Sequence, residues 1–280
     1  MSDELTANLQ PASRASLRVR EMGVLGVLLL EIALFALLVK SSSGNDSWTF
    51  LQSANLLDIL RDTAIIGIAA IGVTCVIITG GIDLSVGGLI ALSCVITAHL
   101  LRAGVAPPLA IGAALLVGIV SGAIAAGLIT GLDLPPFIAT LGLMLVARGL
   151  AFVVSGGDNL AVTTQAPWLT DVFGNDTVLG VPYLVILLAI LALAFAVLLA
   201  RTVWGRQLFA VGGNEVAARY AGVDVRRIKW SVYLLSGFLA ALAGVIYVAR
   251  FGTGRSDAAE GYELDAVAAA VVGGASLAGG

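Results

Sequence analysis

Few side chains in this 280-residue sequence could do chemistry, and their spacing fits no enzyme site. The cysteines Cys75 and Cys94 and the single histidine, His99, lie in or at the end of apolar runs, without the paired spacing of a metal site. Neither Lys40 nor Lys229 completes a glycine-rich phosphate-binding loop, and no serine-nucleophile elbow or zinc-protease motif occurs. We therefore expect no catalytic residue, metal or cofactor, and any ATP that drives this protein must be hydrolysed by a partner chain.

The composition places the chain in a lipid bilayer. Hydrophobic residues make up 59% of the sequence and charged residues 12%, about half of the usual charged share of a soluble domain. The mean hydropathy is +1.02. The 34 glycines suit membrane helices that pack closely through small side chains. A net charge of −3 gives no argument for a nucleic-acid partner.

Apolar runs long enough for membrane helices follow a polar tail over residues 1–21. A span needs about 20 apolar residues. The runs lie near residues 22–39, 63–82, 84–102, 105–130, 134–155, 177–200 and 230–250. An eighth begins near residue 264 and is unfinished at Gly280, so we expect the natural chain to continue. The sequence predicts an all-α polytopic membrane protein, with about eight spans in a membrane domain over residues 22–280.

Basic residues give this domain an orientation. Three arginines precede the first run, and a second basic group occupies residues 201–229, with Arg201, Arg206, Arg219, Arg226, Arg227 and Lys229. The positive-inside rule makes both stretches cytoplasmic, and six crossings separate them, as two ends on one side require. Residues 156–176 carry three aspartates and no basic residue, so we expect them to face outward.

The cytoplasmic segment 201–229 carries the clearest local signal. Asn214 suits a helix N-cap, Glu215 suits the first turn, and Gly222 suits the position after the last turn. These residues predict a very short helix over 215–221, and Asp224 suits the cap of the next helix. Its small apolar face comprises Val216, Ala217, Tyr220 and Ala221. Such a helix could insert into a cleft on a cytoplasmic partner, or lie on the lipid headgroups.

A second signal is the sequence GGIDLSVG at residues 80–87. Gly80 and Gly81 relax a helix, and Asp83 or Ser85 can cap a new one. A helix broken at membrane depth would line a translocation path, because open backbone there must meet protein or water. The alternative is an ordinary cytoplasmic turn between the second and third spans, where the crossing count puts it.

A translocation path for a polar solute needs polar groups and an aromatic ring. The candidates are Thr74, Thr79, Asp83, Ser85, Ser93, Thr97, Phe137 and Thr140. Two charges lie within spans, Glu31 and Arg148, and we favour a structural pair or a snorkelling arginine over a transport role. Acidic residues after the seventh span could form a docking rim for a binding protein or a solvated loop. They are Asp257, Glu260, Glu263 and Asp265.

Four segments together resemble one permease family. They are GGIDLSVG at 80–87, LPPFIATLG at 134–142, GGNEVAARYAG at 212–222, and GYELDA with GGASL between 261 and 277. Their order is similar to that of the ribose/xylose/galactose branch of ATP-binding-cassette (ABC) importer permeases. The third segment resembles the coupling-helix loop of such permeases, so the resemblance assigns contact with the ATPase to Gly213, Asn214, Glu215, Ala217, Ala218 and Gly222.

The resemblance implies a bacterial inner-membrane importer of a monosaccharide that works by alternating access. Its partners would be cytoplasmic ABC ATPase subunits, a periplasmic sugar-binding protein and a second permease copy. Family members usually have about ten spans, so this chain stops short. Alternatives are a permease for branched-chain amino acids, nucleosides or a furanone signal, and an ion-coupled secondary transporter using Glu31 or Asp83. A purely structural scaffold is disfavoured by the four segments.

Overall fold

The computed structural model describes residues 14–42 and 48–280, in two compact units that meet near Ile59. The first unit contains helix α2 (Arg14–Ser42), whose apolar stretch is Leu25–Val39, and the short helix η2 (Thr49–Leu51). Within it the rings of Phe35 and Phe50 stack with centroids 6.1 Å apart. Of the tail expected over residues 1–21, positions 1–13 lie outside the described residues, and positions 14–21 form the first turns of α2.

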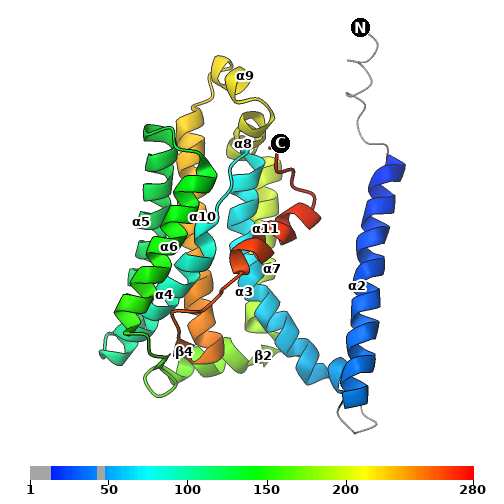
Figure 1. The fold of residues 1–280 in the computed structure, drawn as a ribbon, viewed down its shortest axis with the longest axis vertical. Coiled ribbons are helices and arrows are strands. Elements are labelled where there is room, and N and C mark those ends of the chain that lie inside the picture. Colours follow the sequence, from blue (N-terminus) through cyan, green and yellow to red (C-terminus); the bar gives the residue numbers. More distant parts are fainter. Residues whose placement is uncertain (1–13, 43–47) are drawn as a thin grey trace. The chain divides into compact units, whose positions relative to one another are not determined.

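The second unit confirms the all-α polytopic expectation (Figure 1). Six helices among the described residues are long and apolar enough to cross a membrane. They are α3 (Ser53–Ile78), α4 (Ser85–Arg102), α5 (Pro107–Gly131), α6 (Pro136–Ser155), α7 (Tyr183–Arg201) and α10 (Val225–Phe251). Each covers one of the apolar runs, and prolines at the first turns of α5 and α6 suit their helix starts.

Helix α10 is more deeply buried than α5, α6 and α7, and glycines let its neighbours approach it closely. A Cβ atom on Gly118 of α5 would lie 2.2 Å from the carbonyl oxygen of Gly237, and one on Gly72 of α3 would lie 2.8 Å from the Ser236 Cα. Gly244 meets the backbone of α4 in the same way. Small side chains at such crossings allow backbone-to-backbone packing in lipid, so α10 is held by three helices at once.

Three of the four short strands in the described part of the unit lie in the loop before α7, and the fourth follows α10. Strand β1 (Leu160–Ala161) pairs with β4 (Thr253–Gly254), and β2 (Thr177–Val178) pairs with β3 (Val181–Pro182). A short π-helix, η3 (Leu169–Asn175), lies between β1 and β2. Leu179 and Gly180, at the tip of the second hairpin, both have positive φ, as a two-residue type I′ turn requires. The run expected from residue 177 therefore starts as a hairpin and becomes helical only at Tyr183.

The eighth span is not confirmed as a helix that crosses the bilayer. Helix α11 (Tyr262–Val272) has 11 residues, about 16 Å in length, and ends at Gly273, which precedes Gly274 with φ of +107°. The chain before it runs along α4, from contact with Ala98 at Gly254 to contact with Gly87 at Glu263 (Figure 1). The expectation of a continuous eighth helix was wrong because apolar composition alone does not distinguish a helix from a packed non-helical segment.

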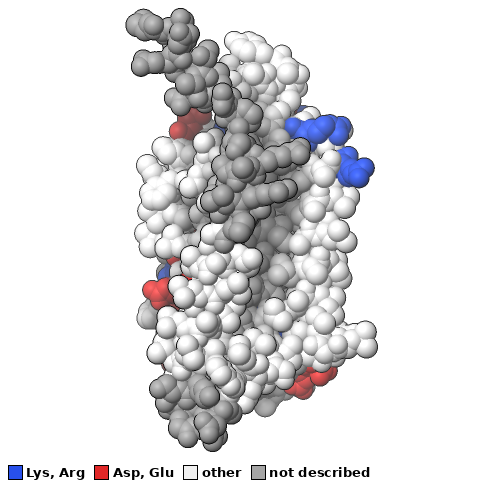
Figure 2. Space-filling model, turned by 90° about the vertical axis from the view of Figure 1, so that its right-hand side faces the viewer, with Lys and Arg blue, Asp and Glu red and all other residues white. Residues whose placement is uncertain are grey.

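Two short helices, α8 (Val203–Gly213) and α9 (Glu215–Tyr220), lie at one end of the unit, opposite the β2–β3 hairpin (Figure 1). We call this end the α9 face. On the side that Figure 2 draws, Lys and Arg side chains gather toward the α9 face, and most of the described surface below them is uncharged. This distribution suits a protein whose middle is surrounded by lipid.

Candidate functional site

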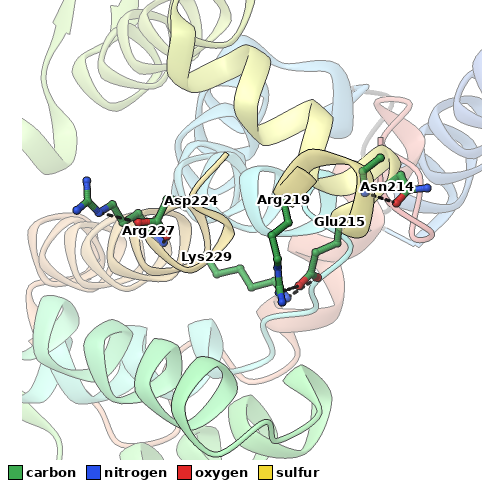
Figure 3. A network of polar contacts seen from close by, with 7 residues as sticks. Asn214, Glu215, Arg219, Asp224, Arg227 and Lys229 are labelled. Atoms are coloured by element: carbon green, nitrogen blue, oxygen red, sulfur yellow. Dashed lines mark hydrogen bonds and ion pairs between the residues drawn. The ribbon is translucent and has the colours of Figure 1, made fainter. Parts of the chain in front are cut away.

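Helix α9 forms as the local sequence predicts. The Asn214 side chain accepts a hydrogen bond from the Ala217 amide at 2.9 Å, and Asp224 caps α10 by accepting from the Arg227 amide at 3.0 Å (Figure 3). Gly222 follows the last turn with φ of +85°, a conformation that side chains with a Cβ rarely adopt. Two caps and one glycine therefore fix a six-residue helix between α8 and α10.

An ion pair ties α9 to the start of α10. Glu215 accepts a hydrogen bond from the Lys229 ammonium group at 2.7 Å and also pairs with Arg219 at 3.2 Å (Figure 3). Lys229 is largely buried, with 24% of its side chain exposed, whereas Arg219 is 71% exposed. The contact from Lys229 is the better shielded of the two, so it holds α9 against α10 more firmly than the surface pair does.

The outer surface of α9 is apolar and exposed. Tyr220 is 91% exposed and Val216 64%, and Ala217 and Gly213 are also exposed. Ala218 is different, because it is 4% exposed and packs into the core of the protein itself. A six-residue helix buries one side to stay attached, and Ala218 lies on that side, so its contact with a partner stays a prediction.

The break at residues 79–84 is partly enclosed by the protein, with Gly80 exposed and Gly81 and Asp83 buried. Asp83 is 1% exposed, and its carboxylate accepts hydrogen bonds from the Ser85 amide at 2.9 Å, the Ser85 hydroxyl at 2.6 Å and the Ser236 hydroxyl at 2.6 Å. Ser236 comes seven residues after Lys229 on α10, about 10 Å further along the helix axis. A surface turn would expose its aspartate, so the burial of Asp83 favours a broken helix enclosed by neighbouring helices over an ordinary exposed turn.

The candidate path residues fall into separate groups. Thr140 of α6 joins the break, because its hydroxyl lies 3.3 Å from the Ile82 carbonyl oxygen. Ser93 is fully buried on α4, eight residues beyond Ser85, where Gly244 packs against it. Phe137 is 50% exposed on α6 and joins neither group.

The three remaining threonine candidates have local partners. The hydroxyls of Thr74, Thr79 and Thr97 donate to carbonyl oxygens three or four residues earlier in their own helices or turns. Thr74 also lines a hollow between α3 and α11. These hydrogen bonds satisfy each hydroxyl inside its own segment, so they do not draw the three residues into one site.

Two residues of α10 at the break escaped sequence analysis. Ser236 donates to Asp83, and the Tyr233 hydroxyl lies over Gly81, where a Cβ atom would be 2.7 Å from it. A polar pair one turn apart inside an apolar run was the available signal. Their partners, however, lie about 150 positions earlier, and one sequence without the fold does not connect them.

Three of the charges considered near the membrane lie in different surroundings. Arg148 reaches the carbonyl oxygens of Ser256 and Ala258 at 3.4 Å, so it supports the segment before α11 and does not snorkel. Glu263 lies against Gly87 inside the unit, so the acidic residues 257–265 do not form one continuous docking rim. The hydrogen bond from Arg255 lowers the pKa of the Asp257 carboxyl in the segment between β4 and α11.

No metal site is found among the described residues, where no group of three His, Cys, Asp or Glu side chains is suitably clustered. Cys75 and Cys94 are both buried and free. This arrangement suits binding and movement. Helix α9 exposes apolar side chains and is tied to α10 by the Glu215–Lys229 ion pair. The break at residues 79–84 is also hydrogen-bonded to α10, through Ser236.

Comparison with known proteins identifies relatives of similar length. The chain is 43% identical to the ribose import permease protein RbsC of Bacillus subtilis (strain 168) over 263 residues, 94% of this chain and 81% of the relative. It is 44% identical to RbsC of Escherichia coli (strain K12) over 233 residues, 82% and 72% of the two chains. It is 36% identical to the fructose import permease protein FruG of Bifidobacterium longum (strain NCC 2705), covering 83% and 70%. No solved structure matches the chain.

A family profile also matches most of the sequence. It covers residues 55–280, which include all six membrane-spanning helices of the second unit, the break and α9. The profile is described as the permease component of a branched-chain amino acid transport system. With this match and relatives above 40% identity, the chain belongs to the permease family of branched-chain amino acid-type transport systems and is a multi-pass membrane protein.

Proposed function

We propose that this chain is the membrane-spanning subunit of a bacterial ABC importer that brings a monosaccharide into the cytoplasm. The names of its relatives support a sugar, since the two most similar relatives given above import ribose and another imports fructose. A relative named as an autoinducer 2 permease, at 36% identity, keeps a furanone-type signal as the second candidate. The description of the family makes branched-chain amino acids the third candidate substrate.

The observation that carries this proposal is α9. An aromatic side chain that is 91% exposed, Tyr220, stands on a six-residue helix in the basic segment 201–229. Exposed aromatic anchors are typical of protein interfaces. Separate ATPase subunits on the cytoplasmic side would receive Val216, Ala217 and Tyr220 in a cleft, and would supply the ATP hydrolysis.

The proposed mechanism is alternating access. Closing of the two ATPases displaces α9, the Glu215–Lys229 pair carries the displacement to α10, and α10 moves the helices packed on it. A periplasmic binding protein delivers the sugar to the opposite end of the unit, and a second permease copy completes the path. The residues at the break, Asp83, Ser85 and Thr140, face that path in the open states, whereas Ser93 and Phe137 have weaker support.

Reconstitution tests this function. We expect the permease, its ATPases and its binding protein in proteoliposomes to take up a pentose or hexose with ATP inside, and to keep doing so when proton and sodium gradients are collapsed. The purified permease alone should hydrolyse no ATP. Uptake that requires an ion gradient and is abolished by Glu31→Gln would favour an ion-coupled secondary transporter. Uptake of a branched-chain amino acid in place of sugars would favour the third candidate.

The proposed orientation puts the α9 face and the N-terminus in the cytoplasm. It rests on the basic residues of segment 201–229 and the acidic segment 156–176 at the other end of the unit. In whole cells, an impermeant thiol reagent should label Gln165→Cys and spare Arg227→Cys until the membrane is opened. Both positions are exposed, and the native cysteines are buried, so they provide little background. The reverse pattern would exclude docking of cytoplasmic ATPases at α9.

A further inference from the structure

One polar group at the intramembrane break has no partner. Tyr233 is 1% exposed, and its hydroxyl makes no hydrogen bond although it can both donate and accept. Buried hydroxyls nearly always have a partner, and one that lacks it calls for an explanation. A phenylalanine at this position would fill the same space without the unsatisfied group. The unpaired hydroxyl therefore destabilises this conformation. We look for a second conformation in which the hydroxyl forms a hydrogen bond.

This hydroxyl lies close to the backbone of the break. A Cβ atom on Gly81 would lie 2.7 Å from the Tyr233 oxygen, so only glycine allows the ring to reach the backbone there. Two residues further along the break, the Asp83 carboxylate is held by Ser236. Tyr233 and Ser236 are three residues apart, and therefore lie on one face of α10, separated by about 4.5 Å along its axis.

The backbone of the break is non-helical, so this segment can shift relative to α10. Gly80 has φ of +77°, and residues 81–84 belong to no helix. Asp83 is bound to its own segment through Ser85 and to α10 through a single hydroxyl. Packed helices change between discrete arrangements, and a shift by about one turn is among the movements seen in switching proteins.

We propose that Ser236 and Tyr233 are alternative partners of Asp83, and that the permease exchanges one for the other as it passes between its two access states. In the state described here the Ser236 hydroxyl donates to the Asp83 carboxylate, and the Tyr233 hydroxyl lies over Gly81 without a hydrogen bond. In the other state the break has moved toward the α9 face relative to α10, and the Tyr233 hydroxyl donates to Asp83. Both side chains are positioning residues, because they act on the helices and touch no substrate.

This exchange rests on the proposed function and connects its two parts. Lys229, Tyr233 and Ser236 follow one another at spacings of four and three, so they share a face of α10. The first is bound to α9 through Glu215, and the last is bound to the break through Asp83. A displacement of α9 that moves α10 along its axis would release one partner of Asp83 and present the other.

The test compares two substitutions that each remove one hydroxyl group and that should shift the populations of the two states in opposite directions. Tyr233→Phe removes the partner of the second state, so that state should become rare and uptake should fall at least tenfold while the ATPases still bind. Ser236→Ala removes the partner of the first state, so the second state should become more populated. Tyr247→Phe on α10 and Ser121→Ala on α5 are the matched controls, because neither residue contacts the break.

The two states are counted from the distance between spin labels at Arg102→Cys, which ends α4, and Arg227→Cys, which begins α10. Movement of the break along α10 should give two distances that differ by about 4–5 Å. Tyr233→Phe should deplete the population in which the break has moved toward the α9 face, and Ser236→Ala should enrich it. Equal populations in both variants and the wild type, or a shift of both in one direction, would overturn the exchange.

The measurement is made on the permease alone and on the assembled complex. If no ATPase binds the wild-type chain, the proposed function fails, while the distances in the permease alone still test the exchange. If the wild-type complex transports sugar and both variants match it in uptake and in distances, the exchange alone is wrong.

Discussion

Replacing Gly118 by Val should leave almost no correctly folded permease. The Cβ atom would lie 2.2 Å from the Gly237 carbonyl oxygen and 2.5 Å from the Ala241 Cβ, so the two helices would have to separate. Backbone atoms give way far less than a flexible side chain. We expect a loss of stability at or above the about 1–3 kcal/mol typical of overpacked cores, because α5 and α10 meet there along their length. Thermal unfolding of the detergent-purified protein measures it.

Gly112→Val provides the matched control on the same helix. A Cβ atom at Gly112 would meet nothing within 4 Å, and both substitutions change the helix propensity of α5 equally. The control should therefore unfold close to the wild-type temperature. Equal behaviour of the two variants would mean that α5 and α10 do not pack through Gly118.

Tyr220→Ala should weaken the binding of the ATPase subunits about 30-fold or more. Tyrosine is one of the residues that dominate protein interfaces, with losses of about 2 kcal/mol or more when an anchor is truncated. In the free permease the side chain is 91% exposed, so its removal should not disturb the fold. Co-purification and titration of the ATPase against detergent-purified permease give the affinity, and the unfolding temperature checks the fold.

Leu179→Ala is the comparison for this effect. Leu179 is fully exposed and apolar like Tyr220, but it lies on the β2–β3 hairpin, at the other end of the unit. Its loss should leave ATPase affinity unchanged. If Tyr220→Ala binds the ATPase as tightly as the wild type does, α9 is not the docking element, and a helix that rests on lipid headgroups becomes the better interpretation.

Local signals in the sequence predicted local structure well. Asn214, Gly222 and Asp224 act where they were expected, because capping depends on residues within one turn. The membrane helices of the second unit were found for a similar reason, since lipid requires a continuous apolar run. The boundary of α7 was missed by six residues, because a hairpin tip at Leu179 is also apolar.

Contacts between distant segments could not be predicted in this way. Burial of Ala218 depends on the helices beneath α9, and the hydrogen bond from Ser236 to Asp83 joins residues 153 positions apart. The motif at residues 80–87 left a surface turn and an intramembrane break equally open until the packing of α10 was known. The role of Arg148 likewise depends on a segment more than 100 residues away.

The segment that runs from Gly252 to α11 has a consequence for how the protein is made. A translocon releases into lipid those stretches that are long and apolar enough as helices, and an 11-residue helix preceded by open backbone does not qualify. Its peptide groups need the walls of α4 and the guanidinium of Arg148 before they leave water. We therefore expect biogenesis in two stages, in which helices α4, α6 and α10 enter the bilayer first and the segment folds against them afterwards.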